Sequence, residues 1–236
     1  MIELLSTLIN IPSVTGSESH IGHVLVQHCE RRGYRVTRQP VHNERFNILA
    51  TTDRTPRVLF CTHMDTVAPF LPARRQGERL YGRGACDAKG QIAAMLEAGE
   101  RLRAADIDDF GFLFVVGEEL VSDGAKTAAS LEVDCEHIIL GEPTDNRLAV
   151  GQKGVLVFEV RAEGTGGHSS QPENGVSAVH ALLDFLATWR RRDWGVDTVL
   201  GANLVNIGVI EGGDGINILA HHARAKGIMR VAMPLA

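Results

Sequence analysis

The chain has 236 residues, of which 44% are hydrophobic and 22% are charged, a composition typical of a globular protein with a substantial core. The formal net charge is -5 and the basic residues are scattered, which gives no electrostatic basis for binding nucleic acid or an anionic membrane. The N-terminus lacks a basic leader and a long apolar run, so we expect a cytoplasmic protein. The four cysteines form no C-x-x-C pair, which predicts free thiols.

Helical and strand patterns alternate in the first 150 residues. The spacing of apolar residues predicts one helix over residues 2–9 and a second that begins near Ser19 and ends at Gly33. Four short apolar runs predict buried strands, at residues 46–50, 58–61, 112–116 and 138–140. A third helix is predicted at 91–102, between the second and third strands. This order favours an α/β domain with a central, largely parallel sheet flanked by helices.

The pattern changes near residue 150. A strand at 154–160 is followed by the loop GTGGHSSQPENG, a helix from Val176 to about Arg190, and strands at 203–210 and 223–231. We therefore predict two domains. Residues 1–151 form the α/β domain, and residues 152–236 form a smaller α+β domain that is incomplete at the end of the chain.

Polar residues follow three of the four strands predicted in the first domain. His63 and Asp65 follow the second strand, Glu118 and Glu119 the third, and Glu142 the fourth. In open α/β sheets, reactive groups collect at the carboxyl ends of the strands. We therefore expect one imidazole and several carboxylates to meet at one edge of the sheet.

A further carboxylate, Asp87, lies in the glycine-rich loop GRGACDAKG, which leads into the third predicted helix, and we expect it to face the same edge. Carboxylates packed together repel each other, so something cationic must hold them ionised. A pair of divalent metal ions with His and Asp/Glu ligands meets this need. Zinc suits the mixed nitrogen and oxygen ligands better than magnesium does.

Each motif also has a simpler explanation. A His-x-Asp at a strand end is often a hydrogen-bonded structural pair, a Glu-Glu after a strand often faces solvent, and Gly-Glu-Pro can be only a turn. The glycine-rich loop could cradle a phosphate, but it lacks the G-x-x-x-x-G-K-[ST] and G-x-G-x-x-G spacings. All the motifs together, in this order at one edge, favour the metal site.

The motifs resemble those of the zinc peptidase family that contains acetylornithine deacetylase, succinyl-diaminopimelate desuccinylase, carboxypeptidase G and aminoacylase. The resemblance covers the whole chain and rests on HMDTV at 63–67, GRGACDAKG at 82–90, GEE at 117–119, GEPT at 141–144, GGHSS at 166–170 and GGDGIN at 212–217. It implies two Zn²⁺ ions, for which Co²⁺ can substitute. By this resemblance, His63 and Glu142 hold one ion, Glu119 holds the second, and Asp87 bridges the two ions.

The resemblance also implies catalytic roles. Asp65 would orient the His63 ring, and Glu118 would be the general base that takes a proton from the attacking water and delivers it to the leaving amine. The second domain would be a lid and dimerisation domain of a homodimer, whose His168 stabilises the oxyanion in the partner's site.

Two further residues of the second domain, Asn217 and Arg230, resemble family positions that contact the substrate carboxylate or the oxyanion. Arg230 could equally be a surface residue of a strand, and His168 a loop histidine that caps the helix after Pro172.

The implied reaction is removal of an acetyl or succinyl group from an N-acylated amino acid, as in acetylornithine deacetylase and so in arginine biosynthesis. A dipeptidase or carboxypeptidase of the same family is the nearest alternative, and a non-catalytic metal-binding homologue is a third. The family takes one more ligand histidine from beyond the lid, and none of the ten histidines fits that context. We therefore predict that this chain binds at least one metal weakly and has little turnover by itself.

Overall fold

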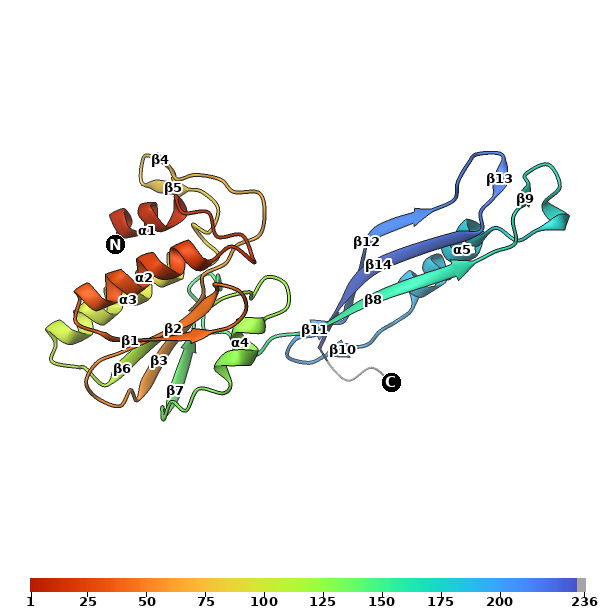
Figure 1. Cartoon of the computed structure of the whole chain (residues 1–236). Helices are drawn as coiled ribbons and strands as arrows, with labels where there is room; N and C mark the ends of the chain where they lie inside the picture. Colours follow the sequence, from red (N-terminus) through yellow and green to blue (C-terminus); the bar gives the residue numbers. More distant parts are fainter. Residues whose placement is uncertain (233–236) are drawn as a thin grey trace. The chain divides into compact units, whose positions relative to one another are not determined.

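Figure 1 shows the computed structural model of the chain, which describes residues 1–232. The chain divides into two compact units, one of residues Met1–Arg147 and one from Leu148 onward. This division falls close to the expected boundary between residues 151 and 152. Within the described residues, no helix combines the length and the apolar character needed to cross a bilayer.

The first unit is built around a five-stranded sheet in the order β1-β2-β6-β3-β7, with β4 and β5 as a separate hairpin. Its helices are α1 (Ile2–Ile9), α2 (Ser19–Arg31), α3 (Lys89–Ala104) and α4 (Asp123–Ala128). Its strands are β1 (Arg35–Pro40), β2 (Phe46–Thr51), β3 (Val58–His63), β4 (Arg74–Gln76), β5 (Arg79–Tyr81), β6 (Phe110–Val115) and β7 (His137–Leu140). The three predicted helices and four predicted strands are therefore all present, and the α/β class is confirmed.

The sheet is mixed rather than largely parallel. Strands β6, β3 and β7 run parallel, whereas β1 pairs antiparallel with β2 and β2 pairs antiparallel with β6. The sequence RVTRQP gave no strand signal because β1 is polar and lies at the edge of the sheet. A short connection joins β1 to β2, and such a hairpin requires antiparallel pairing. The carboxyl ends of β3, β6 and β7 still meet at one edge, where the predicted site residues follow them.

The core of the first unit is asymmetric. Helices α2 and α3 cover one face of the sheet, where Phe110, Phe112 and Phe114 are buried (Figure 1). A smaller cluster around Leu59 lies on the other face, beside α4. The expectation that β7 is buried was wrong, since all four of its residues are exposed. The strand pairs only with β3 at the edge of the sheet, which leaves its apolar side chains open to solvent.

The second unit has a three-stranded antiparallel sheet in the order β12-β14-β8, with α5 along one face (Figure 1). Its elements are β8 (Gly154–Glu163), β9 (Gly167–His168), a 3-10 helix (Pro172–Asn174), α5 (Ala178–Arg191), β10 (Val196–Asp197), β11 (Gly201–Ala202), β12 (Leu204–Gly212), β13 (Ile218–Leu219) and β14 (His222–Val231). Leu182 and Leu186 of α5 pack against Ala223 and Ala225 of β14. The predicted order of strand, helix, strand and strand is confirmed.

Candidate metal centre

His63 is the last residue of β3, which lies between β6 and β7, and its side chain is only 1% exposed. Its Nδ1 lies 3.0 Å from the backbone carbonyl oxygen of Asp65 and 3.4 Å from the Asp65 carboxylate. A carbonyl oxygen can only accept a hydrogen bond, so Nδ1 carries a proton and donates it. Asp65 was expected to orient the His63 ring, and both its backbone carbonyl and, farther away, its carboxylate face Nδ1.

The other ring nitrogen of His63 faces carboxylates. Nε2 lies 2.9 Å from Asp87 Oδ1 and 3.9 Å from Glu142 Oε1. With Nδ1 protonated, a neutral ring directs a lone pair at these oxygens, which are acceptors too. Burial opposes a second proton on the ring, but the hydrogen bond and charge of Asp65, followed by the charges of Glu142 and Asp87, raise the pKa of His63 to about 9. A positive charge is therefore favoured between Nε2 of His63 and these carboxylates.

Glu119 completes a group of three potential ligands. One ligand atom from each of His63, Asp87 and Glu119 lies within 4.8 Å of the other two. Burial, followed by the charge of Asp87, raises the pKa of Glu119. Burial also raises the pKa of Glu142. The charge of His63 opposes this rise, and the charge of Asp87 adds to it. The structure thus brings the four predicted ligands to one edge of the sheet, where the carboxyl groups of Glu119 and Glu142 resist ionisation without a cation.

The side chain of Asp65 is fully buried and holds the turn that follows β6. Its carboxylate accepts hydrogen bonds from Thr15 Oγ1 at 2.8 Å, from Glu118 N at 3.0 Å and from Glu119 N at 3.1 Å. Burial alone would raise the pKa of Asp65, but the hydrogen bonds from His63, Thr15 and Glu119 lower it below its usual value. Asp65 therefore stays ionised and fixes the turn that presents Glu118 to solvent.

This set of donors fits a divalent metal ion. One imidazole nitrogen and three carboxylates are the ligand types that zinc accepts in hydrolytic sites. The Asp87 and Glu142 side chains are 47% and 45% exposed, so the site is open to solvent on one side. His63 and Asp65 form its rigid, buried side.

Two residues near the site were missed by the sequence analysis. Thr15 binds Asp65 from a segment with no motif, and no local signal in the sequence identifies it. Lys89 is 1% exposed, donates a hydrogen bond from Nζ to the Ile11 carbonyl at 2.7 Å, and has its pKa lowered to about 8 by burial. It stands in the GRGACDAKG motif, but lysines are rarely buried, so the sequence alone gave no reason to place it there.

Three predicted site residues lie in the second unit. His168 is exposed, its Nδ1 lies 2.8 Å from Ser170 Oγ, and it pairs with Ile218 of β13. The adjacent Ser169 amide donates to the Asn217 carbonyl at 3.0 Å, so His168 and Asn217 are neighbours. Arg230 is exposed near the opposite end of β14, between Val155 and Leu204. The fold of this unit therefore separates Arg230 from the other two.

The chain is similar to known proteins in sequence and in fold. The peptidase family M20/M25/M40 matches residues 59–218, more than half of the chain. A peptidase M20 domain-containing protein of Schizosaccharomyces pombe is 39% identical, over 98% of this chain and 60% of that protein. A protein of Aspergillus clavatus named probable carboxypeptidase is 36% identical, over 95% of this chain and 56% of that protein. The chain thus spans less than two thirds of the length of these relatives.

Two solved structures share the fold. A tripeptidase from Staphylococcus aureus is 24% identical with a TM-score of 0.78, over 99% of this chain and 66% of that chain. A dinuclear metal-binding peptidase of family M20 from Bacillus subtilis is 15% identical with a TM-score of 0.64, over 98% of this chain and 64% of that chain. The motifs, the strand-end carboxylates and the match over residues 59–218 lead to one conclusion: this chain belongs to peptidase family M20/M25/M40.

Proposed function

We propose that the first unit carries the metal site of a hydrolase that cleaves amide bonds in peptides, with the activity of a carboxypeptidase or dipeptidase. The observation that supports this most directly is the convergence of His63, Asp87 and Glu119 within 4.8 Å, with Glu142 3.9 Å from His63 Nε2. In the proposal these four side chains would hold two divalent ions, most suitably Zn²⁺. The name of the Bacillus subtilis relative supports a dinuclear centre.

Divalent ions in such a site lower the pKa of water and polarise the carbonyl group that is attacked. The side chains of the chain supply the remaining steps. Glu118 accepts a proton from the attacking water at its carboxylate and passes it to the nitrogen of the leaving amine. Its exposed position on the turn after β6 suits that exchange, because the side chain faces solvent while its backbone amide is fixed by Asp65.

The named relatives indicate the class of substrate. The relative at 39% identity is named a peptidase M20 domain-containing protein, and the relative at 36% identity is named a probable carboxypeptidase. This favours cleavage of a peptide bond over the removal of acetyl or succinyl groups that the sequence motifs alone suggested. Deacylation, with its place in arginine biosynthesis, stays a prediction, as do the homodimer and the role of His168 in a partner's site.

The experiment compares two substrate classes at equal concentration, simple dipeptides and N-acetyl or N-succinyl amino acids. The enzyme is the full-length protein, loaded with Zn²⁺ or Co²⁺. We expect hydrolysis of dipeptides that a chelator abolishes. Faster cleavage of the acylated amino acids would instead support the deacylase.

Glu118→Gln is the matched control for mechanism, since it keeps the size of the side chain and removes the base. We expect the rate to fall by roughly 10²-fold or more while bound metal, measured by elemental analysis, is unchanged. An unchanged rate would remove Glu118 from its assigned role.

A further inference from the structure

Three consecutive backbone amides in the turn after β6 each donate to a buried carboxylate. Glu118 N and Glu119 N donate to the two oxygens of Asp65, at 3.0 and 3.1 Å. Gly117 N donates to Glu18 Oε1 at 3.0 Å. The Asp65 and Glu18 side chains are both 0% exposed. The turn is therefore held by two carboxylates, one of which lies beside His63 while the other comes from the start of α2.

Glu18 is itself held by Arg45. The Arg45 guanidinium donates to both oxygens of Glu18, at 2.9 and 3.0 Å, and to both oxygens of Asp123, at 2.8 and 3.1 Å. The Arg45 side chain is 8% exposed. A planar guanidinium that binds two carboxylates through paired hydrogen bonds fixes the orientation of all three groups. Asp123 is the first residue of α4, so the network clamps the chain on both sides of Glu118 and Glu119.

The backbone at Gly117 makes room for this network. Gly117 has a φ of 72°, in the left-handed region that favours glycine. A Cβ atom there would overlap the Asp123 carboxylate and lie 2.7 Å from Arg45 Nη2. The GEE motif therefore needs its glycine for the approach of the Arg45 and Asp123 side chains as well as for the turn.

We propose that Glu18, held by Arg45 and Asp123, is a positioning residue that sets the turn carrying Glu118 and Glu119. The proposal rests on the proposed function, in which Glu119 is a metal ligand and Glu118 the base. The Glu18 carboxylate accepts its hydrogen bonds from Arg45 and from the Gly117 amide, so it acts on the turn through that amide. Two carboxylates on either side of the turn restrain it in a way that Asp65 alone would not, because Asp65 leaves Gly117 N without a partner.

The first test is isothermal titration of Zn²⁺ into the wild-type chain and three variants. Glu18→Gln weakens the pairing with Arg45, and Gly117→Ala displaces the network without a change in charge. Substitution of residues that orient metal ligands typically lowers metal affinity by about 10- to 100-fold. We therefore expect Zn²⁺ affinity to fall by that factor in both variants. Leu25→Ala is the control, since Leu25 is fully buried in α2 and contacts the core rather than the turn.

The control separates positioning from stability. We expect Leu25→Ala to lower the urea midpoint at least as far as Glu18→Gln does and to leave Zn²⁺ affinity at the wild-type value. An equal loss of affinity in Leu25→Ala, or wild-type affinity in both Glu18→Gln and Gly117→Ala, would overturn the proposal. Failure of the wild-type chain to bind Zn²⁺ would instead count against the proposed function.

A second measurement needs no metal. Hydrogen exchange of the metal-free chain, followed by mass spectrometry of peptides that cover residues 116–121, reports whether the amides of the turn are held. We expect exchange to be at least 10-fold faster in Glu18→Gln than in wild type or Leu25→Ala. Equal protection in all three chains would show that Glu18 does not position the turn, whatever the chain binds.

Discussion

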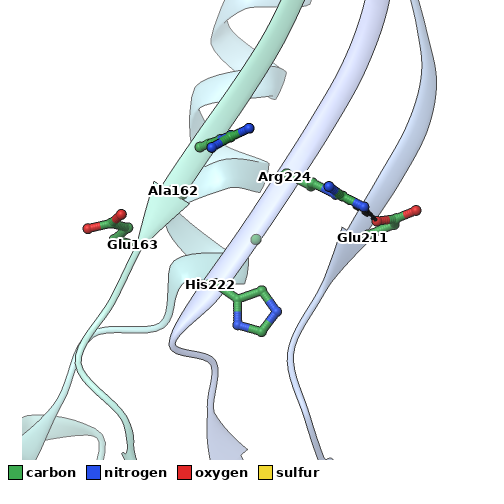
Figure 2. Close-up of a pocket in the computed structure, with 7 residues that line it drawn as sticks. Ala162, Glu163, Glu211, His222 and Arg224 are labelled. Carbon is green, nitrogen blue, oxygen red and sulfur yellow. Dashed lines mark hydrogen bonds and ion pairs between the residues drawn. The ribbon is translucent and has the colours of Figure 1, made fainter.

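Charged residues cluster in both units, but the two clusters are organised in opposite ways. In the first unit three carboxylates, Asp87, Glu119 and Glu142, surround the single imidazole of His63. In the second unit a shallow hollow of about 380 Å³ lies on the sheet, and acidic and basic side chains are mixed along it (Figure 2). Arg224 forms an ion pair with Glu211 at 2.6 Å.

This difference distinguishes a candidate metal site from an ordinary solvent-exposed surface. In the second unit Arg224 of β14 forms an ion pair with Glu211 on the neighbouring strand β12, as cross-strand pairs on an exposed sheet commonly do, and Arg161 forms one with Glu159 on its own strand. In the first unit negative charge exceeds positive charge at short range. Burial raises the pKa values of Glu119 and Glu142, and the charge of Asp87 adds to both rises. Like charges crowded together are costly unless a ligand compensates them. Only the first cluster therefore calls for a cation.

The largest expected effect is selective stabilisation by metal. A ligand that binds only the folded first unit stabilises it by about 3 kcal/mol at a free concentration of roughly 100 times its Kd. The chain allows each unit to be followed separately. Both tryptophans, Trp189 and Trp194, lie in the second unit, and all four cysteines lie in the first.

We expect Zn²⁺ to raise the urea concentration at which buried Cys29 becomes open to alkylation, and to leave the tryptophan fluorescence transition unchanged. A shift of the fluorescence transition alone would show that Zn²⁺ binds the second unit rather than the first. Equal shifts of both would show that the two units unfold together and that the comparison between them fails.

Acid provides a second test of the first unit. His28 is 7% exposed in α2, with Nδ1 3.3 Å from Arg32 Nη1. Burial, followed by the charges of Arg32 and Arg31, lowers the pKa of His28 to about 4. Because the unfolded chain takes up this proton more readily, stability is present in full above pH 6.5 and is lost as the pH falls toward 4, by about 3 kcal/mol.

The variant His28→Gln cannot take up the proton, so its stability should fall less between pH 6.5 and 4 than that of wild type. The urea midpoint followed by Cys29 alkylation measures the difference, while tryptophan fluorescence serves as the internal control. Parallel curves for the two proteins would show that His28 does not stay neutral when folded.

A smaller effect is expected from Asp65→Asn. The carboxylate accepts hydrogen bonds from Thr15, Glu118 N and Glu119 N, whereas the amide group of asparagine has only one accepting oxygen. A buried N–H left without a partner costs about 1–3 kcal/mol. We expect a loss of this order in the first unit, measured by urea unfolding, together with weaker Zn²⁺ binding. Full retention of both would contradict the role given to Asp65.

Sequence reasoning located much of this site because the motifs follow strands, and the parallel strands β3, β6 and β7 must end at one edge. It failed where the structure depends on contacts between residues that are far apart in the sequence. Glu18 meets Arg45 across 27 residues and Gly117 across 99, and Arg45 meets Asp123 across 78. No periodicity records such contacts. The exposure of β7 was missed for a similar reason, because an apolar run shows that a strand can be buried but not whether anything covers it.

The smallest expected effect lies in the second unit and tests whether its charges matter. Arg224→Gln removes the ion pair with Glu211 on the exposed sheet, where water screens both groups. We expect no measurable change in the fluorescence transition and none in Zn²⁺ binding. A clear fall in either would mean that the hollow in Figure 2 is more than a solvated surface. The contrast between the balanced cluster and the acidic one would then no longer identify which of them is the site.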